Sequence, residues 1–136
     1  MTSRDQLAAI HADTLKNYKT GITKPYEFRC QQLEALKRFL TNEQNILAEA
    51  LHKDLHRGTF EALGLEIMAT VIEIDHILKH LKEWMEPQQT SVPALFAPAI
   101  SEIHCEPFGL CLIIGAFNYP VVLTVRDFYS IFNGPI

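Results

Sequence analysis

The chain lacks several features that would assign a protein to a class directly. It has no basic excess, because 12 Lys and Arg stand against 16 Asp and Glu, for a formal net charge of −4. Nucleic-acid-binding domains need a basic surface, so nucleic acid is not expected as a partner. No apolar run approaches the ~20 residues that cross a bilayer, and the first residues lack the apolar core of a signal peptide. We therefore expect a cytoplasmic protein without a membrane segment.

Cysteine is scarce, and its spacing is uninformative. The three cysteines, Cys30, Cys105 and Cys111, contain no Cys-x-x-Cys pair of the kind found in redox and zinc motifs. Because the cysteines are odd in number and have no motif spacing, we expect reduced thiols. Cys111 lies in an apolar run, where Cys usually packs as a small hydrophobic side chain. We interpret all three as structural or incidental, because a nucleophilic Cys needs a polar, partly exposed surrounding that favours its thiolate.

Two Glu-x-x-His sequences raise the alternative of a metal site. Glu49 with His52, and Glu73 with His76, have the spacing found in two-metal centres of helix bundles. Such a site requires both pairs to face the interior. At about 100° per residue, both pairs fall on the side of their helices opposite the apolar residues. The sequence therefore predicts solvated faces here and no metal site.

The first two-thirds of the chain has helical periodicity, with apolar residues such as Leu33, Leu36 and Leu40 on one face. Residues 41–44, Thr-Asn-Glu-Gln, are typical of a capping box that begins a helix. Pro87 would end the last helix of this part. Helices are expected at about 5–19, 25–40, 43–55 and 58–86.

A proline-containing connection follows, and then a short apolar run from Leu110 to Ile114. A strand is expected at 101–106 before it. The run is apolar on both faces, as in a strand buried in a parallel sheet. Ligands of open α/β sheets bind just past the carboxyl ends of such strands. Asn118 follows this run, and its amide is suited to donate a hydrogen bond to a developing oxyanion. The alternative is an Asn that closes a turn before Pro120.

The same segment carries a family resemblance. Residues 106–120 read Glu-Pro-Phe-Gly-Leu-Cys-Leu-Ile-Ile-Gly-Ala-Phe-Asn-Tyr-Pro. They resemble the Asn-Tyr-Pro segment of aldehyde dehydrogenases, particularly the class 3 branch that acts on fatty and aromatic aldehydes. Upstream, Ala-Leu-His-Lys-Asp-Leu at 50–55 and Glu-Ile to Trp at 73–84 also fit. The resemblance covers about residues 5–126. The sequence after about 126 departs from the family pattern, which we interpret as a splice boundary, a retained intron or a truncated gene model.

The resemblance implies an α/β fold. A helical N-terminal part at 1–87 would lead through an extended connection and strand at 88–106. The segment 107–136 would then form the first strands of an incomplete Rossmann-like cofactor domain. The implied reaction is oxidation of an aldehyde to a carboxylic acid with NAD or NADP, through attack by a nucleophilic Cys and hydride transfer to the nicotinamide. Family members are homo-oligomers, so association with other subunits is also implied.

The resemblance also assigns roles to residues of this chain. Asn118 would be the oxyanion donor, and Tyr119 would flank the aldehyde pocket. The segment lining the cofactor would consist of Ile114, Gly115, Ala116 and Phe117. The family's nucleophilic Cys, general-base Glu and phosphate-binding elements have no counterpart in these 136 residues.

Two functions therefore remain open. The chain is either the N-terminal fragment of an NAD(P)-dependent aldehyde dehydrogenase, inactive by itself, or a non-catalytic short isoform that acts as an interaction module on the full-length enzyme.

Overall fold

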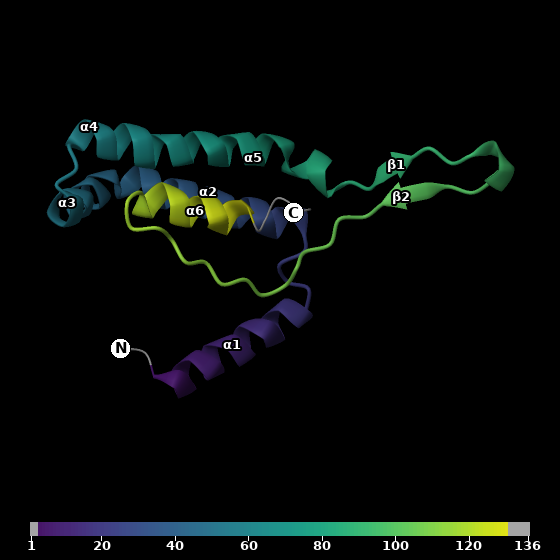
Figure 1. Ribbon diagram of the computed structural model, residues 1–136, viewed down its shortest axis with the longest axis horizontal. Helices are drawn as coiled ribbons and strands as arrows, with labels where there is room; N and C mark the ends of the chain where they lie inside the picture. Colours follow the sequence, from purple (N-terminus) through teal and green to yellow (C-terminus); the bar gives the residue numbers. More distant parts are fainter. Residues whose placement is uncertain (1–2, 131–136) are drawn as a thin grey trace.

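The structure, a computed structural model, describes residues 3–130. Three helices, a broken fourth helix, a small hairpin and a last helix follow one another along the chain (Figure 1). In order, the elements are α1 (Arg4–Lys19), α2 (Tyr26–Asn42), α3 (Gln44–Leu55), α4 (Thr59–Glu61), the π-helical η1 (Ala62–Met68), α5 (Ala69–Met85), β1 (Gln88–Thr90), the 3-10 helix η2 (Ala94–Phe96), β2 (Ser101–Ile103) and α6 (Pro120–Ser130).

The core lies between α2, η1 and α5, and α6 packs against the last two of these elements. Leu33 and Leu40 of α2 meet Ile74 and Leu81 of α5, and all four side chains are fully buried or nearly so. Within each helix the two residues are seven positions apart, which is the helical periodicity that the sequence predicted. Figure 1 shows α1 apart from and below these helices, while the β1–β2 hairpin projects at the end away from α3 and α4.

The first three expected helices are present with boundaries shifted by a few residues, but the predicted capping box is wrong. Thr41 lies inside α2, where its hydroxyl donates to the carbonyl of Lys37 at 2.9 Å. The residue before α3 is Glu43, whose side chain makes no capping hydrogen bond. Burial of Leu40 in the core extends α2 past Thr41, and tertiary packing therefore overrides the local signal.

The expected helix at 58–86 is formed from Thr59 to Met85, but a π-helical segment interrupts it between α4 and α5. Within this segment the neighbouring residues Glu66 and Ile67 are both buried. π-Helical turns often occur at functional sites. The only carboxylate among the buried residues of the described chain therefore lies at an irregularity of its helix.

The strand predictions are partly correct. β2 occupies the first half of the expected strand at 101–106 and pairs antiparallel with β1, so that residues 88–103 form a hairpin. The predicted strand at Leu110–Ile114 is not formed, and Leu112 and Ile114 are 86% and 83% exposed. A strand buried on both faces needs neighbouring strands, and β1 and β2 are the only paired strands among the described residues.

Cys111 is exposed for the same reason, so the expectation that it packs as a buried hydrophobic side chain is wrong. The divergent tail after residue 126 begins within α6, and its residues 131–136 lie outside the described part of the chain. Among the helices of residues 3–130, none combines the length and the apolar character that crossing a membrane requires.

Candidate active site at the start of helix α6

Asn118, Tyr119 and Pro120 form the entry to α6. The amide of Leu123 donates to the carbonyl of Tyr119 at 3.1 Å, which makes Tyr119 the N-cap and Pro120 the first helical residue. Proline suits this position because the N–H that it lacks would have no partner inside the helix. The next two amides, of Val121 and Val122, still need acceptors from elsewhere.

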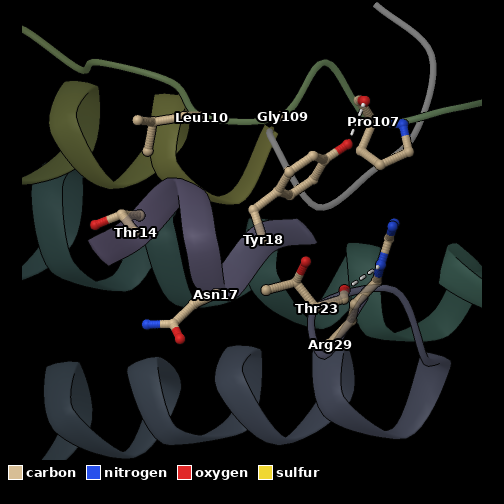
Figure 2. Close-up of a pocket in the computed structure, with 8 residues that line it drawn as sticks. All are labelled: Thr14, Asn17, Tyr18, Thr23, Arg29, Pro107, Gly109 and Leu110. Carbon is tan, nitrogen blue, oxygen red and sulfur yellow. Dashed lines mark hydrogen bonds between the residues drawn. The ribbon is translucent and has the colours of Figure 1, made fainter. Parts of the chain in front are cut away.

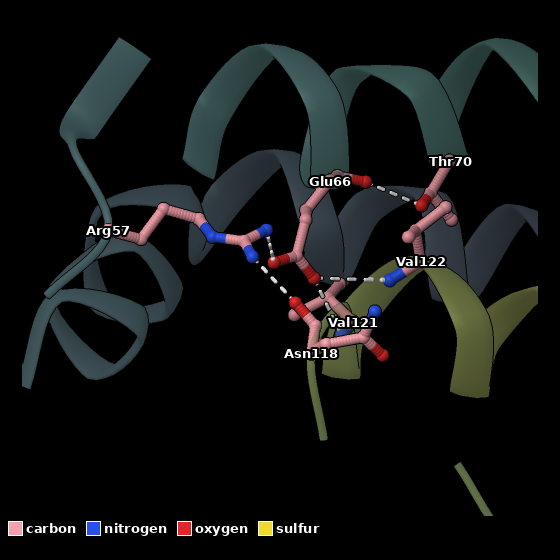
Figure 3. A network of polar contacts seen from close by, with 6 residues as sticks. All are labelled: Arg57, Glu66, Thr70, Asn118, Val121 and Val122. Carbon is pink, nitrogen blue, oxygen red and sulfur yellow. Dashed lines mark hydrogen bonds and ion pairs between the residues drawn. The ribbon is translucent and has the colours of Figure 1, made fainter. Parts of the chain in front are cut away.

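Glu66 supplies these acceptors from η1 (Figure 3). Its Oε2 accepts hydrogen bonds from the amides of Val121 at 2.8 Å and Val122 at 3.4 Å. An N-cap Ser or Asp normally does this with its own side chain, which the aromatic side chain of Tyr119 cannot do. A carboxylate is also favoured electrostatically at the positive end of a helix. Glu66 therefore caps a helix that begins 54 residues after it in the sequence.

Arg57 completes the surroundings of Glu66. The Glu66 side chain is 0% exposed and its partner Arg57 is 13% exposed. One guanidinium nitrogen, Nη1, donates to Glu66 Oε1, and the other, Nη2, donates to the main-chain carbonyl of Asn118 at 2.5 Å. The guanidinium also lies over the ring of Tyr119, with its Cζ 4.2 Å from the ring centroid. A buried carboxylate requires such compensation, and here it has a charged partner and two amide donors.

Asn118 is exposed, and its main chain and side chain play different parts. Its carbonyl faces Arg57, whereas Figure 3 shows its side-chain amide pointing away from Arg57. Within the described part of the chain, no hydrogen bond to this amide is formed. The backbone of Asn118 is thus fixed, while the side-chain amide remains available to a ligand.

Residues 114–116 lead to this turn without regular secondary structure, and Phe117, the first residue of the turn, is 83% exposed. A Cβ atom at Gly115 would lie 1.9 Å from Oγ1 and 3.1 Å from Cβ of Thr124 in α6. The close approach seen at Gly115 is therefore to α6. The cofactor-lining role predicted for Ile114, Gly115, Ala116 and Phe117 stays a prediction, as does the pocket-flanking role of Tyr119.

Arg57 and Glu66 were not singled out by the sequence reasoning. A signal did exist, because Glu66 lies between Leu63 and Thr70 at helical spacing, on a face that is otherwise directed to the core. A charge on such a face requires a partner. Neither its identity as Arg57 nor the contact with Val121 follows from local sequence.

A hollow of about 180 Å³ lies where α1 meets the chain that leads to this turn (Figure 2). The hydroxyl of Tyr18 donates to the carbonyl of Pro107 at 3.1 Å, and Nε of Arg29 donates to the carbonyl of Thr23 at 3.2 Å. Burial lowers the pKa of Arg29 from its ordinary value. The hollow is lined mainly by apolar surface and lies between α1 and the segment around Gly109.

Three of the four residues of the metal hypothesis lie on solvated faces, as their helical phase predicted. Glu49, His52 and His76 are exposed, and Glu73 is half-buried. Glu49 instead pairs with Lys53 at 2.7 Å. Across residues 3–130, no three or more His, Cys, Asp or Glu side chains are grouped as metal ligands would be.

Comparison with known proteins connects this geometry to one family. The sequence model of the aldehyde dehydrogenase family matches residues 2–132. Bovine aldehyde dehydrogenase family 3 member B1 is 40% identical over 118 residues, which cover 84% of this chain and 25% of the bovine protein. The dog protein named dimeric NADP-preferring aldehyde dehydrogenase is 37% identical over 109 residues, covering 80% of this chain and 24% of that protein.

Solved structures agree. The structure described as the substrate-bound state of Staphylococcus aureus AldH matches with a TM-score of 0.91 and 31% identity, over 93% of this chain and 28% of that chain. The chain therefore reproduces part of the aldehyde dehydrogenase fold. This confirms the fold-class prediction. The chain spans about a quarter of the length of the curated relatives it matches. On its sequence and on its fold, the chain belongs to the aldehyde dehydrogenase family.

Proposed function

We propose that this chain carries the oxyanion-donor segment of an NAD- or NADP-dependent aldehyde dehydrogenase, an oxidoreductase that converts aldehydes to carboxylic acids. The observation that carries the proposal is Asn118. Its side-chain amide is exposed and makes no hydrogen bond within the described residues, while its main-chain carbonyl is held by Arg57. This combination leaves a donor free on a fixed backbone.

The chemistry required of Asn118 is donation of one N–H to an oxygen that becomes negatively charged during the reaction. Such a donor acts mainly on the transition state, because the aldehyde oxygen carries less charge before attack. It is most effective when little has to reorganise as the charge develops. Anchoring of Asn118 through Arg57 and of α6 through Glu66 meets this condition.

The extended segment from Ile114 to Phe117 suits the nicotinamide side of a dinucleotide. Its four residues are exposed, and Phe117 lies in the turn that precedes α6. They are therefore free to contact a flat, polar ring. These four residues include no basic side chain that would hold the phosphates. The bound nicotinamide would accept the hydride.

The test uses a hybrid in which this chain replaces the matching segment of a family 3 dehydrogenase. Asn118→Ala should lower kcat by about 10²–10³ and change KM far less. Asn45→Ala, at an exposed position of α3, is the matched control and should keep the parent kcat. Circular dichroism would establish that both variants are folded. An unchanged kcat in folded Asn118→Ala would reduce Asn118 to a turn residue and refute the proposal.

A second function is favoured by one observation. Leu112, Ile114 and Phe117 are all more than 80% exposed within one extended segment. Extended apolar chain can add to the edge of another protein's sheet. This favours a non-catalytic interaction module that associates with full-length subunits. Co-expression with a full-length family 3 enzyme would test it: recovery of a stable complex supports the module, and independent elution of the two chains contradicts it.

A further inference from the structure

We propose that Arg57 and Glu66 are positioning residues for Asn118, so that the hydrogen-bonded pair aims the oxyanion donor. The inference rests on the proposed function and extends it to two residues that contact the Asn118 turn. It is carried by the contacts that connect the chain after α3, the π-helical segment η1 and the turn into α6.

Arg57 is held firmly at its own backbone. His56 ends α3 in the left-handed conformation, with φ at 53°. The ring nitrogen Nδ1 of His52 lies 3.1 Å from the carbonyl of Arg57. The guanidinium therefore starts from a fixed point and spans the gap to Asn118, 61 residues later in the chain.

The contacts of the guanidinium require arginine. One nitrogen donates to Glu66 and the other to the carbonyl of Asn118, while its face covers the ring of Tyr119. A planar fork makes these contacts together, whereas the single ammonium of a lysine cannot reproduce both the two-point donation and the stacking. Arg57 therefore sets the position of the Asn118 main chain relative to η1.

Glu66 fixes the other side of the same turn. Its two carboxylate oxygens contact different partners: Oε1 faces Arg57, and Oε2 accepts from Val121 and Val122. Asn118 is consequently held between a clamp on its own carbonyl and a cap on the helix that follows it. A displacement of about 1 Å in a catalytic group can cost about 100-fold in rate, so loosening either contact should reduce kcat.

A role in stability alone makes a different prediction. If the pair only stabilised the fold, variants would unfold more easily, but the folded enzyme would keep its kcat. If the pair positions Asn118, folded variants would lose kcat with little change in KM, because Asn118 acts on the transition state. The kcat per folded enzyme, with the folded fraction measured separately, therefore distinguishes the two roles.

The experiment has two arms. In the hybrid enzyme, Arg57→Lys keeps the charge beside Glu66 but loses the second donor, and should lower kcat by about 10- to 100-fold with KM nearly unchanged. Arg38→Lys makes the same chemical change in an exposed pair with Glu34 at 3.8 Å and should leave kcat at the parent level. Thermal unfolding of both variants gives the folded fraction at the assay temperature.

The second arm uses the full 136-residue chain and does not depend on activity. Glu66→Gln removes the carboxylate charge, and hydrogen exchange followed by NMR should show faster exchange of the Val121 and Val122 amides by at least about ten-fold. Amides in the middle of α5, such as that of Ile77, should keep their protection. Arg57→Lys should leave the Val121 amide protected, because Glu66 is still present.

The outcomes distinguish this inference from the function on which it rests. Parent-level kcat in folded Arg57→Lys, together with a large loss in Asn118→Ala, would overturn the positioning role and leave the proposed function standing. Parent-level kcat in folded Asn118→Ala would overturn both. If Glu66→Gln fails to fold, Arg57→Lys decides the matter alone, because a kcat loss supports positioning and an unchanged kcat refutes it.

Discussion

Gly115 and Thr124 approach so closely that no side chain fits at position 115. A Cβ atom there would lie 1.9 Å from Oγ1 of Thr124, far inside the distance that atoms tolerate. Thr124 lies in α6, where a β-branched side chain is restricted to few rotamers, which for Thr are two. The contact holds the chain before Asn118 against the helix that follows Asn118. The segments on the two sides of the turn are therefore in contact.

Gly115→Ala should therefore destabilise the chain by about 1–3 kcal/mol, the cost typical of overpacking, and urea unfolding would measure it. Thr124→Ala in the same chain should restore part of the loss, because it removes Oγ1 but keeps a Cβ that would be 3.1 Å away. Gly64→Ala is the matched control, since nothing lies within 4 Å of a Cβ at that position. Equal stability of Gly115→Ala and the parent would disprove the close packing.

The 136-residue chain alone should show no dehydrogenase activity and no measurable affinity for NAD or NADP. The reason is chemical: it lacks counterparts of the family's nucleophilic Cys, general base and phosphate-binding elements. Reduced-cofactor absorbance with hexanal or benzaldehyde, and calorimetry with each cofactor, would measure this. The exposed thiol of Cys111 is the rival nucleophile. Turnover that disappears in Cys111→Ser would contradict the prediction.

The isolated chain should associate through the apolar segment that contains Leu112 and Ile114. An exposed apolar stretch without strand partners is an aggregation hazard. The double variant Leu112→Lys/Ile114→Lys should shift the chain toward monomer in size-exclusion chromatography with light scattering. Ile46→Lys, at another exposed apolar position in α3, should leave the distribution unchanged. A monomeric parent chain at high concentration would exclude this association.

The surface pair of Glu49 and Lys53 predicts a small acid dependence of stability. The hydrogen bond and charge of Lys53 lower the pKa of Glu49. The stabilisation is therefore present above the ordinary pKa of a Glu, and it is lost as the pH falls through the lowered pKa. The effect should be slight because both side chains are exposed. Lys53→Met should flatten this part of the stability profile, whereas Lys79→Met should not.

The helical half of the molecule could be predicted because its signal is local. Leu33, Leu40, Ile74 and Leu81 repeat at helical spacing, and each became core. The prediction of a strand at Leu110–Ile114 was wrong, because it relied on the same kind of local pattern. A run that is apolar on both faces indicates a strand only where neighbouring strands pair with it, and none does so among the described residues.

The candidate site divides in the same way. Asn118 could be found from sequence, because an Asn between an apolar run and a proline is a recognisable local feature and part of a family motif. The contacts of Arg57 and Glu66 that hold Asn118 could not be predicted from the sequence. Burial of Glu66 depends on Arg57 from one connection and on Val121 from a helix 55 residues away, and only the tertiary fold brings them together.

The cap that Glu66 provides has a consequence for the order in which parts of the chain fold during synthesis. Helix α6 has only 11 residues, and isolated helices shorter than about 12–15 residues are marginal in water. A ribosome completes Arg57 and Glu66 well before it reaches Asn118, so the acceptor for α6 is in place before its donors exist. We expect residues 26–85 to fold during synthesis and the Asn118 turn to close last. Pulsed hydrogen exchange on stalled nascent chains would show this as late protection of the Val121 amide.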